Sequence, residues 1–194
     1  MNMKTRNLIA IGAAAVLLAA CIPSVNPFYE EKDVVFDAHL IGEWQDKETT
    51  NNPEIWAFEQ STNKSYDLTV TEDGKTGKFR AYLFKLKQEQ FLDLIPTDCD
   101  YASNQATLVA AAMVPGHLLM RIGQIEPELK IATCDYDWLA KYVQTNSSAI
   151  AHHTESQSMV LMAETADLQK FVLNHLGTNE LFQEYGTMVR RTKQ

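Results

Sequence analysis

Two cysteines, each with two aspartates close by, have the clearest potential for chemistry in this sequence. The two groups are Asp98, Cys99 and Asp100, and Cys134, Asp135 and Asp137. A disulfide between the cysteines would bring four carboxylates into one neighbourhood, and carboxylate oxygens are ligands for Ca²⁺. In the alternative, one aspartate of the second group caps a helix and those of the first lie in a solvated loop.

The sequence contains no short motif of an enzyme class. It lacks a Gly-rich phosphate loop, a His-Glu-x-x-His helix, a Gly-x-Ser-x-Gly elbow and a paired Cys-x-x-Cys site. His152 and His153 come closest to a metal pair, but adjacent side chains on an extended segment point to opposite faces. We therefore predict no catalytic residue, metal or cofactor. An enzyme whose site is assembled from distant residues remains the alternative.

The N-terminal residues have the pattern of a targeting signal. Lys4 and Arg6 form a short basic region, residues 8–20 form an apolar one, and two alanines precede Cys21. The apolar region is too short to cross a hydrocarbon core of about 30 Å. This order resembles a bacterial lipoprotein signal, which is cleaved before a cysteine that becomes linked to diacylglycerol. The resemblance implies a signal over residues 1–20 and lipidation of Cys21; the alternative is an ordinary secretory signal ending near a buried cysteine.

The same resemblance implies a location. Ile22 follows Cys21, where an aspartate would resemble the inner-membrane retention signal of enteric Gram-negative lipoproteins. For a Gram-negative source we expect an outer-membrane anchor, with the domain facing the periplasm.

Loss of Lys4 and Arg6 with the signal takes the net charge from −8 to about −10. An acidic chain disfavours nucleic acid and anionic head groups as partners, so the expected contact with the membrane is through acyl chains.

An envelope location also bears on the other two cysteines. Disulfides persist in such compartments. With Cys21 acylated, Cys99 and Cys134 form an even pair, which predicts a bridge between them. Two buried free thiols are the alternative.

Residues 21–37 form a proline-containing tether followed by an aromatic lead-in that should lie against the domain. The tether and lead-in read Pro-Ser-x-Asn-Pro-Phe-Tyr from Pro23, then Glu-Lys-Asp and Val-Phe-Asp, and are followed by Gly42-x-Trp44. The series resembles a family of uncharacterised bacterial lipoproteins that share this lead-in and the strand pattern after it. That resemblance covers most of the chain and implies no activity.

Gly42-x-Trp44 also resembles the opening motif of lipocalin-like barrels, in which the tryptophan plugs one end. Lipocalins carry a Thr-Asp-Tyr loop and a later arginine that packs on the tryptophan. Here Thr97-Asp98-Cys99 departs from the loop, and no arginine is assigned to Trp44. The resemblance implies that any cavity opens at the opposite end, among the side chains of Tyr66, Tyr82 and Phe84.

The hydropathy pattern supplies the elements around these residues. A period of two over residues 54–95, with a turn at Asp73-Gly74, predicts antiparallel strands. The strand over residues 78–86 is apolar on both faces and should be covered on both sides. Further strands are expected at 117–124, 129–133 and 159–162, and residues 107–114 are helix or strand. Helices are expected at 136–146, after an Asp135 or Asp137 cap, and at 166–176, after Thr165. Residues 190–194 are expected to be a frayed tail.

These elements predict an α+β fold over residues 38–194, a single domain. Its mostly antiparallel sheet, of about seven or eight strands, should be curved or barrel-like, with two packed helices. Two function classes follow. The first is a non-enzymatic envelope lipoprotein that binds a small lipid-like ligand or an envelope protein partner. The second is an envelope enzyme acting through a site assembled from distant residues.

Overall fold

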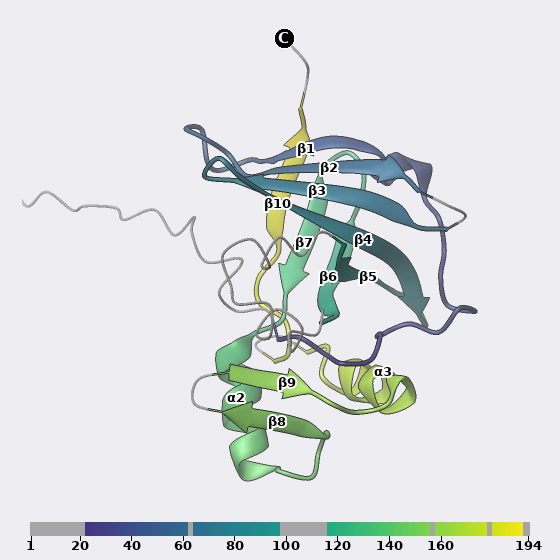
Figure 1. Ribbon diagram of the computed structural model, residues 1–194, viewed down its shortest axis with the longest axis vertical. Helices are drawn as coiled ribbons and strands as arrows, with labels where there is room; N and C mark the ends of the chain where they lie inside the picture. Colours follow the sequence, from purple (N-terminus) through teal and green to yellow (C-terminus); the bar gives the residue numbers. More distant parts are fainter. Residues whose placement is uncertain (1–21, 62–63, 98–115, 156–157, 178–179, 192–194) are drawn as a thin grey trace, which may run out of the picture.

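Eight strands close into an antiparallel barrel in the described part of the computed structural model, which comprises residues 22–61, 64–97, 116–155, 158–177 and 180–191 (Figure 1). The barrel strands are β1 (Gly42–Asp46), β2 (Ile55–Gln60), β3 (Tyr66–Glu72), β4 (Lys75–Leu86), β5 (Glu89–Pro96), β6 (Leu118–Gln124), β7 (Leu129–Thr133) and β10 (Gly186–Arg190). The predicted α+β class with a barrel-like antiparallel sheet is confirmed.

The first seven strands form a meander in which each pairs with the next, and β10 closes the barrel between β7 and β1. The Asp73-Gly74 turn joins β3 to β4 as predicted, with φ of +47° and +74°. Both angles are positive, as a two-residue hairpin turn requires, and glycine adopts such a φ without steric cost.

The closing strand corrects the prediction of a frayed tail at Arg190, which is the last residue of β10. Trp44 is opposite Arg190 in the β1–β10 register, and Gly186 is opposite Ile131 in the β10–β7 register. Only Met188 of the five β10 residues is buried. The segment is too short and too polar to show the hydropathy pattern of a strand. Its pairing with two distant strands specifies it instead.

The segment between β7 and β10 contains both predicted helices, α2 (Tyr136–Thr145) and α3 (Thr165–Asn174), and the hairpin of β8 (His152–Glu155) and β9 (Ser158–Leu161). Asp135 caps α2 by accepting from Trp138 N at 2.9 Å. The prediction of Thr165 as the cap of α3 is wrong. Glu164 is the N-cap residue, and Thr165 Oγ1 donates instead to Pro27 O at 2.8 Å.

Two apolar cores result, one inside the barrel and one between its wall and the helices. Strand β4 contributes to both, as predicted from its two apolar faces. Ala81 and Leu83 point into the barrel, whereas Phe84 and Leu86 contact the second core. A barrel strand covered on both sides anchors the helical layer to the sheet.

The lead-in lies against the barrel wall. Phe28 and Val34 are buried, and Val35 N donates to Leu83 O at 2.8 Å. A 3₁₀ turn, η1 (Ala38–Leu40), then leads into β1. Cys21, Asp98, Cys99, Asp100 and residues 107–114 lie outside the described residues. In the part of the chain that the structure describes, no helix has the length and apolar character needed to cross a bilayer.

Candidate functional site

One end of the barrel is closed by Trp44. Its side chain is fully buried, and its Nε1 donates to Leu40 O in η1 at 2.9 Å. The Arg190 guanidinium lies over the indole ring, with Cζ 4.0 Å from the ring centroid. Arg190 also donates to the carbonyls of His39 and Ile41 and pairs with Glu126 at 2.7 Å. The closed end is therefore fixed by packing, a cation–π contact and charge-assisted hydrogen bonds.

Gly42 is required at this closed end for two reasons. Its φ is +123°, which side-chain-bearing residues rarely adopt, and a Cβ at this position would lie 2.5 Å from Arg190 Nη1. The Gly-x-Trp spacing and Arg190 thus form one unit. Sequence analysis assigned no arginine to Trp44, and only the β1–β10 pairing brings Arg190 to it.

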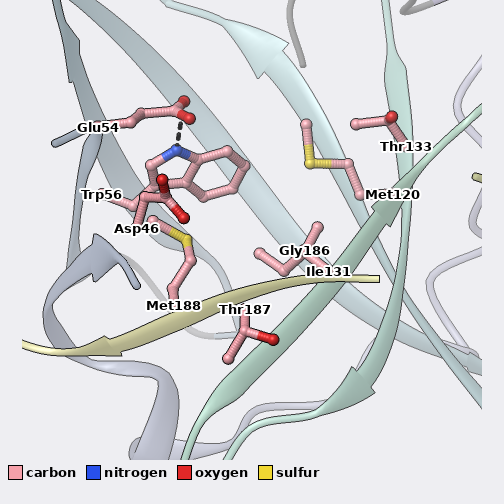
Figure 2. Close-up of a pocket in the computed structure, with 9 residues that line it drawn as sticks. All are labelled: Asp46, Glu54, Trp56, Met120, Ile131, Thr133, Gly186, Thr187 and Met188. Atoms are coloured by element: carbon pink, nitrogen blue, oxygen red, sulfur yellow. Dashed lines mark hydrogen bonds between the residues drawn. The ribbon is translucent and has the colours of Figure 1, made fainter. Parts of the chain in front are cut away.

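A pocket lies at the other end of the barrel, where β1 ends and β2 and β10 begin (Figure 2). Trp56 Nε1 donates to Glu54 Oε1 at 2.8 Å, and Met120 and Met188 lie on different sides of the indole (Figure 2). The residues that line it are Asp46, Glu54, Trp56, Met120, Ile131, Thr133, Gly186, Thr187 and Met188. The lining combines an apolar wall with two carboxylates.

Burial raises the pKa of the Glu54 carboxyl. The hydrogen bond from Trp56 lowers the pKa, and the nearby Glu72 and Asp46 raise it further. The Asp46 carboxylate differs, because it accepts backbone hydrogen bonds from Glu48 and Thr49. Glu54 is thus the acidic group of the pocket whose charge is least well solvated. A cationic partner would offset the free-energy cost of burying this charge.

The pocket volume is about 30 Å³. Pockets that enclose a drug-sized ligand are typically about 300–1,000 Å³, so this one does not enclose a whole lipid. The barrel interior is filled instead by side chains, including Trp44, Phe58 and Tyr66, as is usual for small barrels.

The structure does not bring Tyr66, Tyr82 and Phe84 together, and none of them lines this pocket. Tyr66 points into the barrel at the Trp44 end, where its hydroxyl donates to Asp37 O at 3.0 Å and accepts from Asp37 N at 2.7 Å. Tyr82 and Phe84 face out of the barrel. Tyr82 stacks on Tyr29 at 4.6 Å, and Phe84 stacks on Phe91 at 5.4 Å.

Strand alternation explains this separation. Tyr66 is opposite the inward-facing Ala81 in the β3–β4 register, and Tyr82, the next residue, must face outward. Three aromatics chosen from both faces of a wall cannot share a cavity. The predicted ligand-binding residues did not include Trp56, and nothing local marked Met120 or Met188, which come from other strands.

A buried histidine–aspartate pair lies beneath the lead-in. Asp93 is 0% exposed, and its Oδ1 lies 2.7 Å from His117 Nδ1. Its Oδ2 accepts from Phe28 N at 2.8 Å. Ser24, whose backbone pairs with that of His117, directs its hydroxyl to Leu161 O at 3.5 Å. The contacts of Asp93 therefore fix the lead-in to β5 and β6.

The comparisons with known proteins add no function to this geometry. No family model, curated protein or solved structure matches the chain. Antiparallel barrels host many unrelated functions, so the functional conclusion depends on the side chains.

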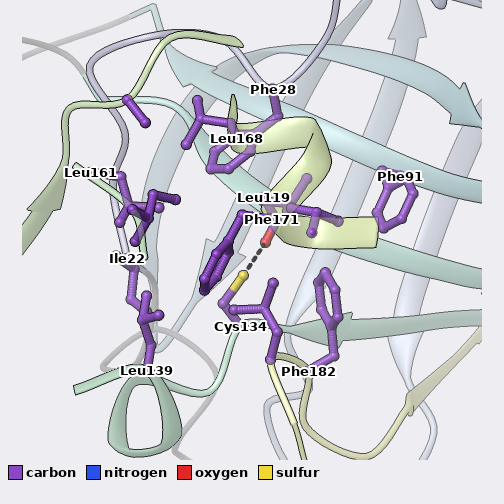
Figure 3. Packing of buried hydrophobic residues seen from close by; sticks show 14 of the residues in the cluster. Ile22, Phe28, Phe91, Leu119, Cys134, Leu139, Leu161, Leu168, Phe171 and Phe182 are labelled. Atoms are coloured by element: carbon purple, nitrogen blue, oxygen red, sulfur yellow. Dashed lines mark hydrogen bonds between the residues drawn. The ribbon is translucent and has the colours of Figure 1, made fainter. Parts of the chain in front are cut away.

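The sequence analysis also considered Cys134 for a disulfide and His152 and His153 for a metal pair. Cys134 is buried in the core outside the barrel, and its Sγ lies 3.6 Å from Leu119 O (Figure 3). His152 Nδ1 lies 2.8 Å from Ile150 O, and His153 Nε2 lies 3.9 Å from Glu155. Among the residues that the structure describes, no three histidine, cysteine or acidic side chains are grouped as metal ligands.

Proposed function

We propose that this chain is a non-enzymatic lipoprotein of the bacterial envelope, whose lipocalin-like barrel binds a partner at the pocket beside Trp56. The position of the pocket carries the proposal, because it lies at the barrel end away from Trp44. The closed end supports the lipocalin-like part: η1, Gly42-x-Trp44 and an arginine over the tryptophan occur together.

The pocket chemistry favours a protein partner. A volume of about 30 Å³ fits a small apolar group that projects from a larger molecule. The indole of Trp56 and the thioethers of Met120 and Met188 supply an apolar, adaptable contact surface. Glu54 and Asp46 at its edge are complementary to a basic side chain. An apolar side chain beside a lysine or arginine on an envelope protein has the matching chemistry.

A small lipid-like ligand is the second candidate. The observation in its favour is that methionines lie on both sides of the pocket, since their unbranched side chains can change rotamer and enlarge it. An amphiphile with a cationic head group would place that group against Glu54.

Photo-cross-linking in the intact envelope tests the binding site. A photoreactive methionine analogue at Met188, whose side chain lines the pocket on the Trp56 side of β10, should give one discrete protein adduct (Figure 2). The same residue at Lys170, exposed on α3, is the control and should give none. A lipid-sized mass increase at Met188 selects the second candidate. Equal labelling at both positions, or no adduct at Met188, contradicts a binding site in this pocket.

The anchor has its own test. In a host with the lipoprotein machinery, the mature protein should begin at Cys21 and carry diacylglycerol. Cys21→Ala should block this processing and release the protein from membranes without unfolding it, because the anchor precedes the core. Recovery of the wild-type protein uncleaved and without a lipid mass would contradict the lipoprotein assignment.

A further inference from the structure

Val25 and Met162 are exposed apolar side chains from distant parts of the chain. They are 48% and 54% exposed, and in the described ranges the only other large apolar side chain in this class is Tyr185. Val25 belongs to the lead-in, and Met162 follows β9. Exposed apolar residues that lie together mark an interaction surface more strongly than scattered ones.

Backbone pairing places the two side by side. Ser24 forms a parallel bridge with Leu161, supported by hydrogen bonds of 2.9 Å from Val25 N to Leu161 O and from Leu161 N to Pro23 O. Ser24 and Leu161 are buried. Val25 and Met162 directly follow these buried residues, and their exposed fractions show that their own side chains face solvent.

Ala151 extends this surface on the other side of Met162. Met162 N donates to Ala151 O at 2.8 Å, and Ala151 is exposed. Three segments joined by backbone hydrogen bonds thus present Val25, Met162 and Ala151 next to one another. We call these three residues the Val25 face.

The distance of this face from Cys21 is limited by covalent geometry. Ile22 is 2% exposed and packs in the core between barrel and helices (Figure 3). Cys21 is bonded to Ile22, so their Cα atoms are about 3.8 Å apart. Val25 is four positions after Cys21, and its Cα is therefore at most about 14 Å from that of Cys21. An anchor at Cys21 therefore joins the folded domain directly, and the tether predicted from residue 21 is not a free linker, because Ile22 is already packed in the core.

We propose that the Val25 face rests on the lipid bilayer, at the level of the phospholipid head groups. This inference depends on the proposed lipidation of Cys21, because the acyl chains hold the adjoining surface at the membrane. The β3–β4 turn lies on the side of the barrel away from the β8–β9 hairpin, so the barrel projects from the bilayer (Figure 1).

The contact is apolar rather than electrostatic. After loss of Lys4 and Arg6 with the signal, the chain carries a net charge of about −10, which anionic lipids repel. Val25 and Met162 instead insert apolar surface among the head groups, in the manner of interfacial anchors. The orientation should therefore be the same on zwitterionic and on anionic vesicles.

Site-specific photo-cross-linking of the lipidated mature protein tests this orientation. The protein is purified from envelopes and reconstituted in vesicles of phosphatidylethanolamine and phosphatidylglycerol, and separately in phosphatidylcholine. A photoreactive residue at Val25 or Met162 should form lipid adducts in both vesicle types. Thr76, exposed beside the β3–β4 turn, is the control and should form none. Met162→Glu should reduce the lipid adducts formed from position 25 several-fold.

The outcomes separate this inference from the proposed function. If mass spectrometry finds the diacylglyceryl group on Cys21 but positions 25 and 162 label no more lipid than position 76, the orientation is overturned and the anchor stands. Adducts to a second copy or to another protein at these positions overturn it as well. A wild-type protein without the acyl group contradicts both the anchor and the orientation.

Discussion

The guanidinium of Arg190 lies 4.0 Å from the centroid of the Trp44 ring. It also donates to the carbonyls of His39 and Ile41, on the turn that leads into β1. Arg190 thus joins the last strand of the barrel to its first turn, across the ring that fills the closed end.

Arg190→Ala should therefore destabilise the barrel by about 2–3 kcal/mol, through loss of the cation–π contact and the hydrogen bonds to carbonyls. The matched control is Arg191→Ala, which removes an exposed ion pair with Glu43 and should cost at most about 1 kcal/mol. Urea denaturation monitored by circular dichroism measures both. Equal losses would mean that Arg190 acts only as another surface charge.

Gly42→Ala should cost about 2–3 kcal/mol, since the new Cβ meets Arg190 Nη1 and φ is +123°. Gly74→Ala is the control for backbone strain alone, because its φ is +74° but nothing lies within 4 Å of the added Cβ. It should cost about 1–2 kcal/mol. If Gly74→Ala proves as costly as Gly42→Ala, the close approach of Arg190 does not constrain position 42.

The closed end shows what the sequence could and could not predict. The Gly-x-Trp spacing, the alternation of β4 and the cap of α2 are local, and each predicted its element correctly. Arg190 belongs to a strand with one buried residue, and its partner Trp44 is far away in the chain. Such long-range pairing leaves no local pattern, so the strand and its arginine were both missed.

The candidate site, too, could be predicted only in part, because its residues come together through long-range pairing. Trp56 lies in a segment of alternating hydropathy, but the sequence did not single it out from the other aromatics. The choice among aromatics failed because Tyr66 is on the inner face of the wall and Tyr82 on the outer face. Which face is inside follows from the closure of the barrel, and the local alternation of each strand leaves that choice open.

A disulfide between Cys99 and Cys134 stays a prediction. Closing a loop of this size should stabilise the fold by roughly 3–4 kcal/mol on the chain-entropy model. Because Cys134 is buried, the thiols must be labelled after denaturation without reductant. The expected result is no labelling of either cysteine in the mature protein, and labelling of both after reduction. Modification of both thiols before reduction would rule the bridge out.

Glu54→Gln should stabilise the protein at neutral pH, because burial raises the pKa of the Glu54 carboxyl in the folded state. For a carboxyl with a raised folded pKa, the favourable contribution is present below the unfolded value, about 4.3, and is lost as pH rises through the folded value. At pH 7 the charged carboxylate beside Trp56 therefore lowers the free energy of unfolding of the wild-type chain, and the glutamine variant lacks this charge.

The amide oxygen of the glutamine can still accept the hydrogen bond from Trp56 Nε1. Thermal unfolding at pH 7 and at pH 4 measures the effect, with Glu59→Gln, at an exposed position on β2, the strand that follows Glu54, as the control. We expect a higher Tm for Glu54→Gln at pH 7 and a smaller difference at pH 4; a variant less stable than wild type at pH 7 would show that the charge of Glu54 stabilises the pocket.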